Sequence, residues 1–421
     1  MRFEQYDFLP LIKENLATLG FKKPTDIQYK AISPIMKGED VLAIAQTGTG
    51  KTAAFAIPLL DFIAKQKKVV KYNGIKCLVM VPTRELAIQI AEAFDAIGKG
   101  TGVHVLSLYG GVDQDNQIFK LKHGVDILIS TPGRMFDLIN QGFVDLKNLE
   151  TLVVDEADHM LDLGFLKDIT DIMRHIPRER QTLFFSATIN ERIKKLAYSI
   201  VRNAIRIQIS PDNPVNKNIE HAVAFIEMDD KRFFMERLVN EFPGSKIIIF
   251  VRTKVRAERV CKALERAGIH SETIHGDKEQ SDRMSVLNDF KLGKNNILIA
   301  TDVSSRGIDI PNVDYVVNYD LPEVPENYVH RVGRTGRGVQ KGQAVSFCSK
   351  EEKTLLKDIE EYIGSPVEVM KIDKGLYEET ISFTNDETQN DWRSLLKEDE
   401  ENSKKTYVAP IKGRPKKKNK K

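Results

Sequence analysis

Cysteines are scarce in this sequence, and they lie far apart. Cys77, Cys261 and Cys348 are the three cysteines in 421 residues, and no two of them form a C-x-x-C pair. This spacing excludes a disulfide framework and a cysteine-ligated zinc site. It is typical of a reducing compartment, so we expect a cytoplasmic protein.

Long hydrophobic runs are also missing. No stretch approaches the roughly 18 apolar residues that a membrane-spanning helix needs, and residues 1–5 do not lead from a basic segment into an apolar run. We therefore expect neither a signal peptide nor a membrane partner. Hydrophobic residues make up 41% and charged residues 29%, as in ordinary globular proteins, and the length favours about two to three domains.

Short apolar, β-branched runs alternate with helical patterns along most of the chain. We expect buried strands at 41–44, 77–81, 126–129, 151–154 and 182–185, with a helix at 84–98. The pattern pauses in a polar stretch with two prolines at 209–217 and restarts at 246–251, 296–300, 315–319 and 343–347. The alternation predicts an α/β fold, in which each mostly parallel sheet is covered by helices on both faces.

The domain organisation follows from these patterns and from the charge distribution. We expect one domain at 1–208, a linker at 209–217, a second domain at 218–370, and a flexible tail at 371–421. The net charge is only +3, but seven of the last ten residues are Lys or Arg and none of them is acidic. The tail therefore ends in a basic segment.

A glycine-rich run at 45–52 fits the phosphate-loop pattern G-x-x-x-x-G-K-[ST], once Ala45 is allowed at its first position. Backbone N–H groups of Thr47, Gly48, Thr49 and Gly50 can cradle phosphates there. Lys51 can reach the β- and γ-phosphate oxygens, and the Thr52 hydroxyl can contact Mg²⁺.

Two acids, Asp155 and Glu156, follow the apolar run at 151–154. An exposed turn would also account for them, but the carboxyl ends of strands in such sheets are where ligands bind. One acid could hold a metal ion through water and its neighbour could orient an attacking water. Together with the phosphate loop, the acids predict hydrolysis of a nucleoside triphosphate.

Ten ordered motifs, spread over residues 1 to about 370, resemble those of the DEAD-box ATP-dependent RNA helicases of superfamily 2, of the bacterial type with a short basic tail. They lie at 20–28 (the Q motif), 45–52, 82–87, 110–111, 131–134, 155–158, 186–188, 275–283, 300–309 and 330–337. The resemblance implies two tandem RecA-like domains with ATP and Mg²⁺ as cofactors. It also implies RNA-stimulated ATP hydrolysis, coupled to local unwinding of short RNA duplexes and remodelling of RNA or RNA–protein complexes.

The resemblance implies that the Q motif recognises adenine. The Gln28 amide offers a donor and an acceptor that match adenine N6 and N7, Phe21 stacks on the ring, and Phe3 supports it. The resemblance also implies that Asp155 binds Mg²⁺ through water and that Glu156 orients the attacking water.

Further residues link the nucleotide to the second domain. The resemblance makes Arg334 and Arg337 arginine fingers that act on the γ-phosphate, and it puts Asp309 near the ribose. Asp158, the Ser186 and Thr188 hydroxyls and His330 would couple the state of ATP to domain closure.

The RNA contacts that the resemblance implies go mainly to the RNA backbone. They involve Thr83, Arg84, Gly110, Gly111, Thr131 and Arg134 in the first domain, and Gln280, Arg283, Thr301 and Asp302 in the second. Small hydroxyls, glycines and arginines suit phosphate and sugar oxygens, so binding should be independent of RNA sequence. Taken singly, Thr83 or Thr131 would more often cap a helix.

The basic tail has two interpretations. It is either a solvated end or a tether that holds RNA through counterion release, and we favour the tether, with ribonucleoprotein or RNA-decay partners as further tail ligands. The motifs themselves also fit an ATP-dependent RNA clamp or a DNA helicase. A nucleotide-regulated scaffold is less favoured, because it has little need of Lys51, Glu156 and Arg334 together.

Overall fold

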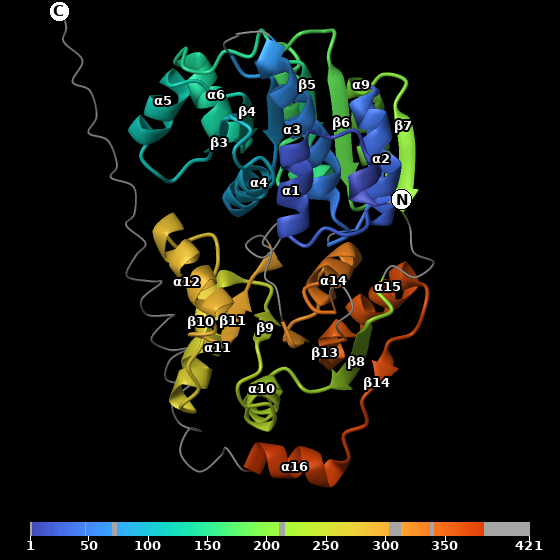
Figure 1. Cartoon of the computed structure of the whole chain (residues 1–421). Coiled ribbons are helices and arrows are strands. Elements are labelled where there is room, and N and C mark those ends of the chain that lie inside the picture. The colour runs from blue at the N-terminus through green and yellow to red at the C-terminus, as the bar shows by residue number, and fades with distance from the viewer. Residues whose placement is uncertain are drawn as a thin grey trace, which may run out of the picture.

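A computed structural model describes residues 2–46, 48–69, 74–209, 215–302, 313–336 and 341–382. In these ranges the chain forms two seven-stranded parallel sheets, one above the other in Figure 1, with helices on both faces of each. This arrangement confirms the predicted α/β fold. None of the helices in the described ranges is long and apolar enough to cross a membrane.

The first sheet is built from residues 41–209. Its strands are β1 (Val41–Ala45), β2 (Cys77–Met80), β3 (Val105–Leu108), β4 (Ile127–Ser130), β5 (Thr151–Val154), β6 (Gln181–Ser186) and β7 (Ile205–Ile209). Its helices are η1 (Phe3–Gln5), α1 (Pro10–Thr18), α2 (Asp26–Met36), α3 (Lys51–Val69), α4 (Arg84–Ile97), α5 (Asp115–Lys122), α6 (Pro132–Asn140), α7 (Ala157–Asp162), α8 (Leu166–Ile172) and α9 (Glu191–Ile200). The strand order is β3-β4-β2-β5-β6-β1-β7.

The second sheet is built from residues 219–369. Its strands are β8 (Ile219–Phe225), β9 (Ile247–Phe250), β10 (Glu272–Ile274), β11 (Ile297–Ala300), β12 (Tyr315–Asn318), β13 (Gly342–Cys348) and β14 (Glu368–Val369). Its helices are α10 (Lys231–Glu241), α11 (Lys254–Arg266), α12 (Gln280–Leu292), α14 (Pro325–Val332), η2 (Lys350–Glu352), α15 (Lys353–Ile363) and α16 (Lys374–Ser382). The strand order is β10-β11-β9-β12-β13-β8-β14.

Alternation along the strands divides each core into two layers. In β1, Val41 and Ala43 belong to the hydrophobic cluster under α2, α3 and α4, whereas Leu42 and Ile44 belong to the cluster on the other face. All four side chains are buried because helices cover both faces. This is why the central strands appear in the sequence as continuous apolar runs rather than as alternating ones.

All nine expected strands exist within a residue or two of their predicted ends, but β3, β7, β8, β10 and β14 were not predicted. The edge strand β7 shows the reason. Its sequence alternates isoleucine with Arg206 and Gln208, and only Ile207 is buried. The missing strands are short or lie toward the sheet edges, where the apolar signal is weak.

Ordered structure continues beyond the expected start of the tail. In α16, the Tyr377 ring lies 4.9 Å from that of Phe234, and its hydroxyl donates to Asp230 Oδ2 at 2.8 Å. Arg237 Nη1 of α10 also donates to the buried Thr380 hydroxyl of α16 at 2.9 Å. The prediction of a flexible tail from residue 371 is therefore wrong for residues 371–382, because these contacts dock the helix on α10. The rest of the tail, at 383–421, and most of the predicted linker, at 210–214, lie outside the described residues.

Candidate functional site

The predicted nucleotide-binding residues gather at the carboxyl ends of the central strands of the first sheet. Lys51 is the first residue of α3, after β1, and Asp155 and Glu156 follow β5. Strand β6 lies between β1 and β5. In a parallel sheet these ends meet at one edge, so the phosphate loop and the acids face the same space.

The side chain of Lys51 is almost fully buried. Only 6% of the residue is exposed, and its Nζ finds no hydrogen-bond partner among the residues that the structure describes. A buried ammonium group without a partner is costly, so the position fits an anionic ligand. The N-terminus of the 19-residue helix α3 adds a favourable dipole. Thr52 is next to it in α3, while Thr47 lies outside the described residues.

Gln28 joins the Q motif to the phosphate loop. Its Oε1 accepts from the Thr25 N–H at 2.9 Å, and its Nε2 donates to the Gly50 carbonyl at 3.2 Å. Gly50 has φ +91°, and a Cβ there would lie 2.4 Å from Gln28 Nε2, so only glycine fits. One N–H and one lone pair of the amide stay available for a base. Phe21 meets the buried Phe3 edge-on, with ring centroids 5.8 Å apart.

The pKa values of the two acids are shifted in opposite directions. Burial raises the pKa of Asp155 to about 6, although the charge of Lys51 acts to lower it. Burial also acts to raise the pKa of Glu156, but a 3.4 Å hydrogen bond from His159 and the charges of His159, Lys51 and Arg334 outweigh it and bring this pKa to about 2. Glu156 is therefore ionised at neutral pH. It also has a left-handed backbone, with φ 50°, a strained conformation that is common at functional sites.

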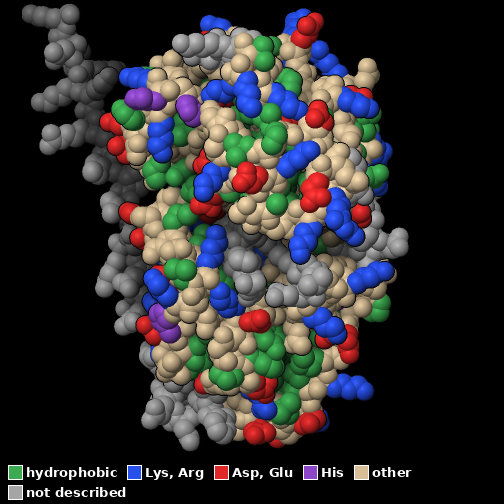
Figure 2. Space-filling view, in the orientation of Figure 1, with side chains coloured by type: hydrophobic (Ala, Val, Ile, Leu, Met, Phe, Trp, Pro, Cys, Tyr) green, Lys and Arg blue, Asp and Glu red, His purple; other side chains and the backbone are tan. Residues whose placement is uncertain are grey.

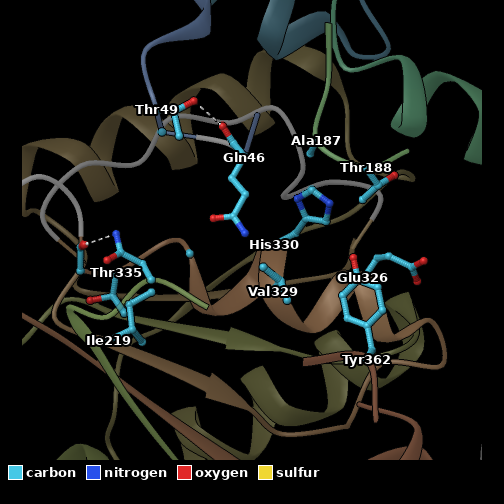
Figure 3. Close-up of a pocket in the computed structure, with 14 residues that line it drawn as sticks. Gln46, Thr49, Ala187, Thr188, Ile219, Glu326, Val329, His330, Thr335 and Tyr362 are labelled. Carbon is cyan, nitrogen blue, oxygen red and sulfur yellow. Dashed lines mark hydrogen bonds between the residues drawn. The ribbon is translucent and has the colours of Figure 1, made fainter. Parts of the chain in front are cut away.

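The second domain contributes a cation to this space. Arg334 follows α14, is 4% exposed, and donates through Nε to the His330 carbonyl at 3.2 Å. In Figure 3, Gln46, Thr49 and Thr188 from the first domain face His330 and Thr335 from the second across a cavity of about 110 Å³. The predicted residues Arg337 and Asp309 lie outside the described residues.

Asp158 connects α7 to the segment after β6. Its Oδ2 accepts from the backbone N–H groups of Ala187 at 3.1 Å and Thr188 at 3.0 Å, and the Ser186 hydroxyl donates to the Thr188 carbonyl at 2.8 Å. The sequence predicts a link through the two hydroxyls. In the structure, Asp158 is linked instead to the main-chain N–H groups of this segment. Residue types alone do not indicate a link of this kind.

The expected RNA residues of the first domain converge at the ends of β2, β3 and β4. Gly111 has φ +78°, a backbone conformation that favours glycine, and a Cβ there would lie 2.1 Å from Arg84 Nη1 and push the guanidinium away. Arg134 donates to the Val112 carbonyl at 3.0 Å, which holds it beside the 110–111 glycine pair. Thr83 caps α4 by accepting from the Leu86 N–H at 3.3 Å. Thr131 precedes α6 and is mostly buried.

Gln280 and Arg283, at the start of α12, contact the first domain. Gln280 Nε2 donates to Glu85 Oε1 at 2.9 Å, Arg283 Nη2 lies 3.0 Å from the same oxygen, and Arg84 Nη1 lies 3.5 Å from Gln280 Oε1. Glu85 is 6% exposed. Sequence reasoning missed Glu85 as a site residue, because nothing local shows that its partners lie almost 200 residues away.

Asp302 is held by an arginine of its own domain. Arg331, which is 1% exposed, pairs with both carboxylate oxygens, Nε with Oδ1 at 2.5 Å and Nη2 with Oδ2 at 2.8 Å. This pairing positions the segment that includes the buried Thr301. Arg331 is a second residue that sequence reasoning missed, although it lies inside the 330–337 motif.

Family models and a curated relative agree on what the chain resembles. A model described as DEAD/DEAH box helicase matches residues 25–196, and one described as helicase conserved C-terminal domain matches residues 230–339. The ATP-dependent RNA helicase CshA of Listeria monocytogenes is 41% identical over 360 residues, which are 86% of this chain and 68% of that protein.

Solved structures are similar to the chain over nearly its whole length. Dbp5 of S. cerevisiae bound to RNA and ADP BeF3 aligns with TM-score 0.79 at 29% identity, over 95% of this chain and 99% of that one. A Dbp5 point variant bound to Nup159, Gle1, IP6 and ADP aligns with TM-score 0.61 at 29% identity, over 93% and 100%. The chain belongs to the DEAD-box family of ATP-dependent RNA helicases, and its two α/β units are RecA-like domains.

Proposed function

We propose that this helicase binds ATP between its two domains and hydrolyses it when RNA brings them together. One observation supports this most strongly. Lys51, Glu156 and Arg334 come from both domains and interact electrostatically, as the effect of the two cations on the Glu156 pKa indicates. Cleavage of the γ-phosphate then depends on the contact between domains.

Each of the three residues has a separate task in this proposal. Glu156 is an ionised carboxylate that accepts a hydrogen bond from the attacking water and orients it in line with the γ-phosphate. Lys51 from the first domain and Arg334 from the second neutralise the growing charge of the transferred group. Arg337 is proposed as a second finger, and Asp309 as a ribose contact.

The donor set also suits Mg²⁺. The hydroxyl of Thr52 and the carboxylate of Asp155, the latter through water, would hold it, and oxygen ligands are what Mg²⁺ prefers. The raised pKa of Asp155 reflects a buried acid that a cation would stabilise in its ionised form. Bound there, Mg²⁺ supplies positive charge to the β- and γ-phosphate oxygens.

Base selection is assigned to the Q motif. Phe21 stacks on adenine with Phe3 behind it, and the free donor and acceptor of Gln28 pair with N7 and N6. Because the same amide bonds to Gly50, adenine recognition and the phosphate loop are mechanically connected.

RNA is proposed to contact main-chain and hydroxyl groups of the two converging clusters. Arg84, the 110–111 glycines, Thr83, Thr131 and Arg134 form the first cluster. Gln280, Arg283, Thr301 and Asp302 form the second, in which Asp302 acts through Arg331. Contacts to sugar and phosphate make binding independent of sequence. Glu85 bonds to residues of the second cluster, so closure and RNA binding reinforce each other.

The domain limits follow the two sheets. The first domain is proposed to span 1–208 and the second 218–370, joined by the linker at 209–217, and α16 extends the second domain to residue 382. The basic segment at the end of the tail is proposed to tether RNA, or to dock ribonucleoprotein or RNA-decay partners, in the cytoplasm.

Replacing Glu156 with Gln tests the catalytic assignment. The amide keeps the shape of the side chain, so ATP binding should be retained, while RNA-stimulated phosphate release should fall by about 10²–10⁴-fold. Binding of a fluorescent ATP analogue and steady-state phosphate release measure the two effects. Glu14→Gln, on the exposed face of α1, is the matched control. Hydrolysis that survives in Glu156→Gln would show that another residue orients the water.

A further inference from the structure

Helices α5 and α6 expose aromatic rings beside a positive charge. Phe119 on α5 is 60% exposed, and Phe143, just after α6, is 36% exposed. The His123 ring lies 4.1 Å from the Phe119 ring, and Lys122 Nζ lies 5.4 Å from the centroid of the Phe143 ring. In Figure 1 these helices lie on the same side of the molecule as α12. We call Phe119, Lys122, His123 and Phe143 the α5–α6 surface.

The Phe119–His123 pair is held in place before any ligand binds. The two residues are one helical turn apart, and His123 Nδ1 donates to the Phe119 carbonyl at 2.8 Å. This bond fixes the orientation of the imidazole ring against the phenyl ring. A ligand that stacks on the pair therefore loses little side-chain entropy from the protein.

The α5–α6 surface is rigidly connected to the proposed RNA cluster of the first domain. Gln117 on α5 accepts from Arg134 Nη1 at 2.9 Å, and Gln141, directly after α6, donates to Gln114 Oε1, directly before α5, at 3.3 Å. Arg134 in turn donates to Val112, directly after the 110–111 glycines. The 37%-exposed side chain of Val112 lies between the glycines and α5. The exposed rings thus continue the RNA cluster outward along one rigid unit.

Charge along α5 favours a nucleic acid over a protein at its far end. The acidic residues Asp113 and Asp115 are at the N-terminal end, whereas Lys120, Lys122 and His123 are at the C-terminal end, next to the rings. Lys120 interacts with Asp95 of α4, which leaves Lys122 as the cation beside Phe143. Aromatic side chains next to cationic ones are typical of surfaces that bind single-stranded nucleic acids, since the bases stack on the aromatic rings and the phosphates contact the cations. A protein-docking face would have contiguous apolar residues.

We propose that the α5–α6 surface is a stacking platform for unpaired RNA bases that extend beyond the interdomain RNA site. Phe119, backed by His123, takes one base on its exposed face, and Phe143 takes another, while Lys122 contacts the intervening phosphate. The platform rests on the proposed RNA contacts of Arg84, Gly111 and Arg134, and it lengthens the site without adding sequence preference.

Binding to RNAs of two lengths distinguishes the contribution of the platform from that of the interdomain site. The full-length protein, with a non-hydrolysable ATP analogue, is titrated into fluorescent oligouridylates of about 6 and about 20 nucleotides, since single-strand sites span roughly 4 to 16 nucleotides. Phe119→Ala should weaken binding of the longer RNA about fivefold or more, the loss of roughly 1 kcal/mol of stacking. Binding of the shorter RNA should stay unchanged, and Phe119→Trp should restore the affinity for the longer RNA.

Phe62→Ala, which removes a 44%-exposed phenylalanine from α3, is the matched control. If Phe119→Ala binds the longer RNA as tightly as this control does, the platform is wrong and the surface is a protein-docking face. If Phe119→Ala weakens the binding of both RNAs equally, the platform proposal is also wrong, because the ring would then contribute to the interdomain site. The proposed interdomain contacts fail separately, if Arg134→Ala leaves binding of the shorter RNA unchanged.

Discussion

The two domains have the same sheet topology and use it for different chemistry. Numbered within each domain, the strands follow the order 3-4-2-5-6-1-7 in both sheets. Loops at equivalent places can therefore be compared directly. In the first domain the loops after the first and fifth strands carry the phosphate loop and the acids, whereas the second domain fills the same places with an internal ion cluster.

Lys51 and Lys231 show the difference most clearly. Each is the first residue of the helix that follows the first strand of its domain, and each is buried. The ammonium of Lys231 donates to Glu352 Oε2 at 2.5 Å and to the Tyr319 carbonyl at 2.7 Å. Lys51 Nζ has no such partner in the described part of the chain.

The acids that follow the fifth strand of each domain, Asp155 and Asp320, also differ in their partners. Within the described ranges, the hydrogen bond that Asp155 accepts comes from the backbone N–H of Glu156. In the second domain, Asp320 Oδ1 lies 2.9 Å from Arg256 Nε and 3.9 Å from Lys231 Nζ. The same fold therefore leaves the Lys51 ammonium without a hydrogen bond in the described part of the first domain, and ties Lys231 to a carboxylate and a carbonyl in the second.

The largest expected effect is on stability, in the second domain. Lys231→Met removes the fully buried cation of this cluster and leaves Glu352 and Asp320 with only the partly exposed Arg252 and Arg256. Breaking a buried ion pair in this way typically costs about 3–5 kcal/mol. Calorimetry should show the second domain unfolding at a much lower temperature. Combining it with Glu352→Gln should recover part of the loss, because the two residues interact directly. A double variant as unstable as the sum of the single variants would contradict the pairing.

Lys51→Met should affect activity more than stability. Its ammonium makes no hydrogen bond in the described part of the chain and only a charge interaction with Asp155 and Glu156, so the free energy of unfolding should fall less than in Lys231→Met. RNA-stimulated ATP hydrolysis should drop by about 10²–10³-fold, as when one preorganised donor to a transition state is removed. Phosphate release and calorimetry test both parts. The comparison fails if Lys51→Met destabilises the protein as much as Lys231→Met does.

A smaller effect is expected where the domains meet. Glu85→Gln weakens charge-assisted hydrogen bonds that contribute about 1.5–3 kcal/mol, so RNA should close the two domains less readily by roughly 10- to 100-fold. Energy transfer between dyes on the two domains, with RNA and an ATP analogue, measures closure. Glu92→Gln, an exposed change on the same helix, is the control. Unchanged closure in Glu85→Gln would mean that Arg283 and Gln280 find other partners.

The smallest effect is a pH dependence in the second domain. Burial lowers the pKa of His221, on β8, from its usual 6.5 in spite of nearby Glu368, and its Nδ1 bonds to the Tyr328 hydroxyl at 2.9 Å. The unfolded chain therefore binds a proton more readily, and stability should fall as pH drops through 6.5 towards the lower, folded-state pKa. Each unit of lowering corresponds to at most about 1.4 kcal/mol. Thermal unfolding of His221→Gln, compared with the parent between these pH values, should lack this contribution.

Sequence patterns sufficed for what is local. The apolar runs of β1 and β5 depend on neighbouring residues, and both strands form at their predicted places, with the 45–52 run and the two acids at their carboxyl ends. Contacts between distant segments could not be found in this way. The pairing of Glu85 with Arg283 and of Asp302 with Arg331, the left-handed backbone of Glu156, and the docking of α16 through Tyr377 and Thr380 arise only when the chain is folded.

The hydrogen bond from Gln28 to Gly50 has a consequence for selectivity. A purine that does not pair with the amide would leave Gln28, and with it the Gly50 carbonyl, less well placed, because Gln28 Nε2 donates directly to that carbonyl. Under the proposed roles, guanine nucleotides should therefore be bound more weakly and cleaved more slowly than ATP, since one amide serves both the base and the phosphate loop.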